Sequence, residues 1–492
     1  MNTFFKKTYH QPLAKFAVLA LSLTLTVSSC KKDFLVAKPE LSLIDEEAFT
    51  SPERILAQVN GLYATAKSGA LFGGRYLIYN DIRAEEFRVR EFNSNTGATV
   101  HNATVQSSDT NLGNIWTAGY LVINRVNYFL EGLEKNKKVL SEALYDNYKA
   151  EARFLRAYAY FGLVQIFAKP YVLNNGASRG LPIRLKAELT AENNTLKSST
   201  VAQVYAQILD DLNEAEKSLP NTYGSALLRT TRAHKNTAIA VKTRVYLAMG
   251  NYAKVLEEGN KIVPQAAPFE NAQRAPHALQ ANIASVFVAP FTTSESIFSL
   301  PMDATNPPGT QNQLGFYFNA GNGNLEYLIN TTGFGIYSDP AWPAADARRT
   351  AFIQQYSASI GWFTKKFSGT APFVDFVPQI RYAEVLLNVA EAEALIAGGN
   401  LVRSRALLDA VRHRSDPNYD FGALATGAAL EKAIMTERRI EFLAEGMRYN
   451  NLARKAEPML SIGAGSLIQV ADPRYTLPLP DVETYYNPAA DW

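Results

Sequence analysis

The feature that most constrains the fold of this sequence is an order of segments that occurs twice. In residues 231–262, two stretches with the apolar spacing of a helix flank Gly250-Asn251. In residues 381–413, two such stretches flank Gly398-Gly399-Asn400. A glycine with positive φ after a helix reverses the direction of the chain. We therefore expect two antiparallel helical hairpins at these places.

Other segments show the same helical spacing of apolar residues. They are residues 51–66, 114–130, 145–167, 200–219 and 430–454. Repeated helix–turn–helix units at irregular spacing resemble tetratricopeptide-like hairpins. The predicted fold class is all-α, an α/α superhelix of such hairpins with a loop-rich, variable insert.

The insert is residues 264–378, where prolines are frequent and helical spacing stops. It contains Pro307-Pro308 and the run Gly321-Asn322-Gly323-Asn324. Long loops on a rigid scaffold are where binding residues usually lie. We therefore expect this segment to face a ligand.

The N-terminus carries an export signal. Three lysines precede an apolar stretch, residues 16–27, which is shorter than the about 20 residues that span a bilayer as a helix. The stretch ends in Val27-Ser28-Ser29-Cys30, which resembles a bacterial lipobox. The alternative is a simple secretory signal beside a chance cysteine. Cys30 is the only cysteine, which excludes an internal disulfide, and lipidation gives it a use.

Taken together, these patterns predict five parts of the chain. Residues 1–29 are a lipoprotein signal peptide, 30–50 a lipidated tether, 51–263 a helical scaffold with a loop at 69–113, 264–378 the ligand-facing insert, and 379–492 a second helical scaffold with a Pro-rich tail.

The charge balance argues against nucleic acid as a partner. Removal of residues 1–29 takes three of the 49 basic residues and none of the 46 acidic ones, so the net charge falls from +3 to zero. Proteins that bind phosphate backbones usually carry a basic excess.

The sequence shows little that could carry catalysis. The five histidines share no metal-ligand spacing, and no P-loop, dinucleotide fingerprint or nucleophile elbow is present, so no cofactor or metal is expected. Glu384, Glu391 and Glu393 on one helix are the only opening for a glycosidase-like carboxylate pair. We interpret them as a solvated helix face with charge pairs. We interpret Glu437, Arg438, Arg439, Glu441 and Glu445 as a helix with ion pairs between residues three and four positions apart.

Binding is the stronger interpretation, because sugar sites combine flat aromatic platforms with a few placed polar groups. For each aromatic taken singly, core packing is the main alternative. Trp362, beside Phe363, is expected to be structural. The candidate ligand-binding residues are Trp342, Tyr317, Tyr337 and Trp116, with Arg83, Asn80, Asn319 and Asp339 as polar neighbours.

Ordered motifs over nearly the whole exported chain resemble the SusD/RagB-like outer-membrane lipoproteins. They include Cys30-Lys31-Lys32-Asp33-Phe34-Leu35, Trp116 with Ile123-Asn124-Arg125-Val126-Asn127, Glu151-Ala152-Arg153-Phe154-Leu155-Arg156-Ala157-Tyr158, Arg381-Tyr382-Ala383-Glu384, Glu437-Arg438-Arg439 and Leu477-Pro478-Leu479-Pro480. The resemblance implies a right-handed bundle of helical hairpins and a SusC-type TonB-dependent transporter as partner. These motifs are scaffold residues, so the resemblance transfers no ligand-binding residue.

The resulting expectation is a non-catalytic outer-membrane lipoprotein, facing the cell exterior, that captures an oligosaccharide for the transporter. A peptide ligand, a lipid-anchored glycoside hydrolase and a purely structural partner of the transporter remain as alternatives.

Overall fold

A computed structural model describes residues 47–321 and 324–490 of the chain. The predicted signal peptide, the lipidation site at Cys30 and most of the predicted tether lie outside the described residues. Within the described part, no helix is both long enough and apolar enough to cross a membrane.

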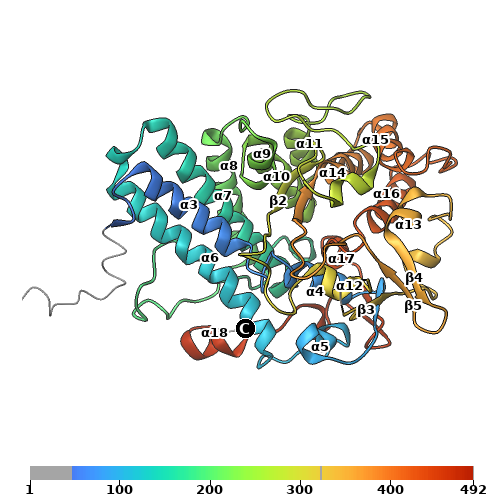
Figure 1. The fold of residues 1–492 in the computed structure, drawn as a ribbon, viewed down its shortest axis with the longest axis horizontal. Coiled ribbons are helices and arrows are strands. Elements are labelled where there is room, and N and C mark those ends of the chain that lie inside the picture. The colour runs from blue at the N-terminus through green and yellow to red at the C-terminus, as the bar shows by residue number, and fades with distance from the viewer. Residues whose placement is uncertain (1–46, 322–323, 491–492) are drawn as a thin grey trace, which may run out of the picture.

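Helices dominate the architecture, and they form a curved array (Figure 1). The α-helices are α3 (Pro52–Ala66), α4 (Arg75–Ile82), α5 (Ala98–His101), α6 (Thr110–Lys135), α7 (Glu142–Phe167), α8 (Val201–Ser218), α9 (Ala226–Thr231), α10 (Lys235–Ala248), α11 (Tyr252–Gly259), α12 (Leu314–Phe318), α13 (Ala347–Phe352), α14 (Tyr382–Leu395), α15 (Leu401–His413), α16 (Gly427–Glu441), α17 (Arg448–Ala453) and α18 (Asp481–Tyr486). Successive helices pack on one another from α3 and α6 through α7, α8, α10 and α11 to α14, α15 and α16. This arrangement confirms the predicted all-α fold class.

Capping residues fix where these helices begin. Ser51 accepts a hydrogen bond from Arg54 N at the start of α3, with Pro52 at the first helical position. Thr200 and Gln203 form a reciprocal capping box at the start of α8. The predicted turns are present, because Gly250 and Gly398 have φ values of 67° and 73°.

In the described part of the chain, the strands are short and form four antiparallel pairs. They are β1 (Phe87–Val89) with β3 (Tyr327–Ile329), β2 (Ser296–Leu300) with β6 (Val377–Arg381), β4 (Ile353–Ser357) with β5 (Gly361–Thr364), and β7 (Met459–Ser461) with β8 (Ser466–Ile468). Two of these pairs, β1–β3 and β2–β6, tie loop segments to distant parts of the chain. The hairpin β4–β5 projects at the edge of the molecule, beside α13 (Figure 1).

Two predictions about local structure were wrong. The segment predicted as a loop at 69–113 contains the buried helix α4 and the strand β1. The single helix predicted at 430–454 is two helices, α16 and α17. Ala444 and Gly446 between them have φ values of 66° and 74°, which no α-helix accommodates.

The interpretation of the acidic helices as solvated was also wrong. Glu384, Glu391 and Glu393 on α14 are buried, and each pairs with an arginine from another element. Glu437 and Glu441 on α16 are buried too, and both bind Arg348 of α13 instead of neighbours on their own helix. These buried ion pairs therefore connect different elements inside the fold.

Candidate functional site

The structure buries six of the eight candidate ligand residues. Trp342 is 2% exposed and Tyr317 is fully buried, as is Asn80. Trp116, Arg83 and Asn319 are also buried. Only Tyr337 and Asp339 are half-buried, so that part of each side chain lies at the surface.

Two of the buried candidates hold the loop-rich segment together. The Tyr317 hydroxyl donates to Gln311 O (3.0 Å), and its ring stacks on Tyr327 with centroids 6.0 Å apart. The amide of Asn319 donates to Phe367 O (3.0 Å), and its oxygen accepts from Gly321 N (2.8 Å). Their polar groups are occupied by the fold.

Three aromatic side chains of the insert lie together, and part of this group reaches the surface. We call these residues, Tyr337, Trp342 and Trp362, the ring cluster. The rings of Tyr337 and Trp362 have centroids 5.3 Å apart at an interplanar angle of 36°. Trp342 meets Tyr337 edge-on at 6.1 Å and forms the buried base. The structure therefore brings two predicted ligand residues together with Trp362, for which the sequence predicts a structural role.

The strand pairing of the hairpin explains why Trp362 reaches the surface. Successive side chains of a strand point to opposite faces. On β5, Phe363 is buried against Leu325 and Leu328, so Trp362 points the other way and is half-buried. Its partner across the hairpin is the exposed Gln355. No local spacing in the sequence reveals which residue of the pair faces outward, because that depends on the packing of Phe363.

Helix α13 fixes the base of the ring cluster. The Arg349 guanidinium lies 4.3 Å from the Tyr337 ring centroid and 4.9 Å from that of Trp342. It also donates to Tyr337 O (2.6 Å) and to Trp342 O. A cation over an aromatic face is attracted by its quadrupole. The neighbouring Arg348 points into the interior, where it binds the helix cap Asp346.

A second anchor holds the segment that leads into Tyr337. The Glu86 carboxylate accepts from Ile336 N (2.8 Å) and from Arg439 Nε (2.6 Å). Arg439 in turn donates to the carbonyl of Phe334 (2.7 Å), whose side chain is 70% exposed. Burial raises the pKa of Glu86, although Arg439 opposes that shift. These contacts hold an exposed phenyl ring three residues from Tyr337.

Polar groups surround the ring cluster. The half-buried Asp339 accepts from Ala341 N (2.9 Å) with one carboxylate oxygen. The exposed Gln355 lies directly across the hairpin from Trp362, on the same face. Flat rings with an amide and a carboxylate at their edge can bind a ligand that has apolar faces and hydroxyl groups.

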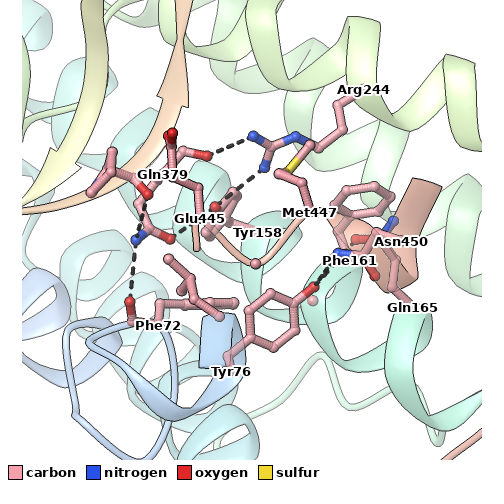
Figure 2. A pocket seen from close by; sticks show the side chains of 14 residues that line it. Phe72, Tyr76, Tyr158, Phe161, Gln165, Arg244, Gln379, Glu445, Met447 and Asn450 are labelled. Carbon is pink, nitrogen blue, oxygen red and sulfur yellow. Dashed lines mark hydrogen bonds between the residues drawn. The ribbon is translucent and has the colours of Figure 1, made fainter. Parts of the chain in front are cut away.

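Figure 2 shows a different cavity, which lies between α4, α7, α10, β6 and residues 445–450. Its volume is about 20 Å³, room for about one water molecule. Polar groups of its wall bind one another: Arg244 donates to the backbone carbonyl of Gln379 (2.6 Å), and the Tyr158 hydroxyl donates to the Gln379 side chain (2.9 Å). This cavity is too small for a nutrient ligand.

A larger pocket, of about 270 Å³, surrounds Trp116 between α6, residues 184–194 and α18. The rings of Trp116 and Tyr120 lie 4.9 Å apart, and Tyr486 forms part of the wall. The Trp116 indole donates to Glu483 (3.0 Å). Tyr120, one helical turn after Trp116, could have been found by its spacing, whereas Tyr486 lies in the distant tail and gave no local signal.

No group of three or more metal-ligating side chains is found among residues 47–321 and 324–490. The three glutamates on α14 that offered the only catalytic prospect are held in ion pairs. Glu384 binds Arg244 (2.6 Å) and Glu393 binds Arg403 (2.8 Å), while Glu391 binds Arg454 (2.5 Å).

Comparison with known proteins agrees with this architecture. The family described as "Starch-binding associating with outer membrane" matches residues 33–247, and the SusD family matches residues 365–487. SusD-like protein P2 of Formosa agariphila is 24% identical to this chain over 540 residues, covering 96% of this chain and 98% of that protein.

Solved structures extend the likeness to three dimensions. A SusD superfamily protein from Bacteroides fragilis is 34% identical with a TM-score of 0.82, covering 91% of this chain and 100% of its own. A laminarin-binding SusD-like protein has a TM-score of 0.69 at 22% identity, with 90% of this chain and 99% of that chain covered. On this likeness over nearly its full length, the chain belongs to the SusD/RagB family.

Proposed function

We propose that this protein captures a glycan at the outer face of the outer membrane and delivers it to a partner TonB-dependent transporter. The observation that carries the proposal is the ring cluster, with its half-buried Tyr337 and Trp362 in the loop-rich insert. The laminarin-binding protein of the same fold supports a glycan as ligand.

The proposed site uses stacking first and hydrogen bonds second. A pyranose ring would lie against Tyr337 and Trp362, with Asp339 and Gln355 within reach of its hydroxyl groups. Because Tyr337 and Trp362 are half-buried at the surface, an internal unit of a longer chain could bind there. In this proposal residues 264–378 are the ligand-facing part, and residues 51–263 and 379–492 are the scaffold.

Two further parts of the proposal concern the anchor and the absence of catalysis. A lipid on Cys30, exposed by removal of residues 1–29, would hold the protein at the membrane. Binding without turnover is supported by the pairing of Glu384, Glu391 and Glu393 with arginines, because a general acid needs a proton and access to substrate.

The test is calorimetric titration of the protein against laminarin, other polysaccharides, oligosaccharides and peptides, with Trp362→Ala as the variant. An aromatic stacking contact contributes about 1–2 kcal/mol, so the variant should bind the glycan about tenfold more weakly. The matched control is Tyr485→Ala, which removes a ring that is 79% exposed on α18, at a distance from the hairpin (Figure 1).

Unchanged glycan affinity in Trp362→Ala would refute the ring cluster as the site. A saturable isotherm with peptides alone would replace the glycan with a peptide ligand. Release of reducing sugar by the purified protein would show that it is an enzyme instead.

A further inference from the structure

Arg83 is a buried cation with no acidic partner. It is 2% exposed, yet within the part of the chain that the structure describes no carboxylate lies within 4.0 Å of its guanidinium. Other buried arginines, such as Arg156, Arg348 and Arg381, each bind a carboxylate at 2.8 Å or less. An unpaired buried charge is costly.

The contacts of Arg83 leave one nitrogen of the guanidinium without a hydrogen-bond partner. Its Nη2 donates to Tyr475 O (2.6 Å) and Arg474 O (3.3 Å), and the group lies 4.0 Å from the centroid of the Tyr449 ring. Its Nη1 has no hydrogen-bond partner in the described structure. A guanidinium nitrogen is a donor only, so what is missing is an acceptor.

Arg83 lines a cavity of about 320 Å³ between the α5 region and residues 473–478. Most of the remaining wall is apolar, including Val100, Val105 and Leu477. The second basic residue of the wall, Arg474, is already paired with Asp472 (2.7 Å). The cavity is similar in size to small-molecule sites, which start at about 300 Å³.

We infer that this cavity binds a small organic carboxylate whose oxygen accepts a hydrogen bond from Arg83 Nη1. The carboxylate supplies the counter-charge that the fold does not, and the apolar walls cover the body of the ligand. A tetrahedral dianion such as sulfate suits the cavity less, because the apolar walls would leave its other oxygens without donors. This site is independent of the ring cluster and of the proposed glycan function.

The test is calorimetric titration of the lipidated protein, in a neutral polyoxyethylene detergent, with benzoate, benzyl alcohol and inorganic sulfate at constant ionic strength. Benzoate should bind saturably with 1:1 stoichiometry, and benzyl alcohol and sulfate about tenfold or more weakly, because a charge-assisted hydrogen bond to a buried cation contributes about 1.5–3 kcal/mol. Arg83→Gln should reduce benzoate affinity by a similar factor.

Three variants separate the explanations. Val105→Trp fills the cavity from its half-buried rim, keeps Arg83 and should also abolish binding, which decides the matter if Arg83→Gln fails to fold. Arg54→Gln removes an exposed arginine of α3 and should bind benzoate normally. Trp362→Ala should bind benzoate normally even if glycan binding is lost. Equal binding of benzoate and benzyl alcohol, no saturation, or full binding by Val105→Trp would overturn the inference.

Discussion

At the scale of single residues, the interior of this protein depends on ionic contacts that the sequence did not predict. Around α13 and α16 lies a buried ion cluster. It comprises Arg348, Arg381, Arg412, Arg414 and Lys366 with Asp346, Glu295, Glu437, Glu441 and Glu445. Arg348 alone binds three carboxylates, on Asp346 (2.6 Å), Glu437 (2.5 Å) and Glu441 (2.9 Å).

The first prediction concerns the removal of one cation from this cluster. Arg348→Met leaves three buried carboxylates short of a partner, and breaking a buried pair in this way costs about 3–5 kcal/mol. The matched control is Arg54→Met, whose ion pair with Glu47 is exposed and contributes about 1 kcal/mol or less. Urea unfolding of the two variants and the wild type measures both values. Similar losses in both variants would contradict the prediction.

The second prediction concerns acid stability and two stacked histidines. Burial lowers the pKa of His234 to about 3 and that of His277 to about 4, from an ordinary value of 6.5. Their rings lie 5.6 Å apart. Both stay neutral in the folded state while the unfolded chain takes up protons below pH 6.5. Their stabilising contribution is therefore complete above pH 6.5 and is lost as the pH falls toward 4.

The variant His277→Gln removes the contribution of one of these two histidines to the pH dependence of stability. Between pH 7 and 4.5 the wild type should lose about 2 kcal/mol more unfolding free energy than the variant, because one pKa unit corresponds to about 1.4 kcal/mol. Urea unfolding at several pH values gives the two slopes. Comparing slopes rather than absolute stabilities removes the contribution of the carboxylates that titrate in both proteins. Parallel slopes would show that His277 takes up its proton in the folded state.

At the scale of elements, the sequence predicted helices well where local signals end them. Ser51, Thr200 and Gly250 mark boundaries by capping and by positive φ, and the structure agrees at each. The break between α16 and α17 was missed because the apolar spacing continues across it. What separates these helices is a tertiary contact: the backbone at Gly446 meets α4, where a Cβ would lie 2.5 Å from Leu77 Cα.

The third prediction compares two glycines with nearly the same φ. Gly446→Ala meets both a φ of 74° and the backbone of Leu77, and should cost more than about 3 kcal/mol. Gly398→Ala has a φ of 73° with open space around it, and should cost about 1 kcal/mol for conformation alone. Thermal or urea unfolding of the two variants measures how much the contact with the Leu77 backbone adds to the cost of the substitution. Equal costs would mean that α4 and α17 shift apart freely.

The candidate site was predictable only in part, for the same reason. Composition and loop position predict that aromatic residues of the insert gather near the surface. Tyr337 and the polar Asp339 are partly exposed there. Which rings face outward depends on strand pairing and packing from distant segments. Trp342 and Tyr317 are buried in the core. Trp362 lies partly at the surface because its neighbour on the strand, Phe363, packs into the interior.

At the scale of the whole molecule, the proposed membrane anchor at Cys30 lies outside the described residues. The first described helix, α3, packs on α6, and Phe49 before it packs against Phe129 of α6 with ring centroids 5.9 Å apart. The ring cluster is made of residues between positions 337 and 362, so the proposed lipid anchor at Cys30 and the proposed binding surface are separate parts of the chain.

That separation gives the fourth prediction, for the variant Cys30→Ser. The substitution removes the thiol that would carry the lipid, and no helix within residues 47–321 or 324–490 can replace it as a membrane span. A single acyl chain binds membranes only marginally and stable anchoring needs more than one, so loss of every chain should release the protein into the soluble fraction after cell lysis. Its thermal midpoint and its glycan affinity should equal those of the lipidated protein.

Fractionation with immunoblotting measures the release, and calorimetry on the released form measures the thermal midpoint and the glycan affinity. Continued membrane retention of Cys30→Ser after removal of residues 1–29 would show that a second attachment exists. The first place to test would be the exposed Leu121 and Tyr486 beside the buried Trp116, because an exposed apolar face can bind a membrane protein directly.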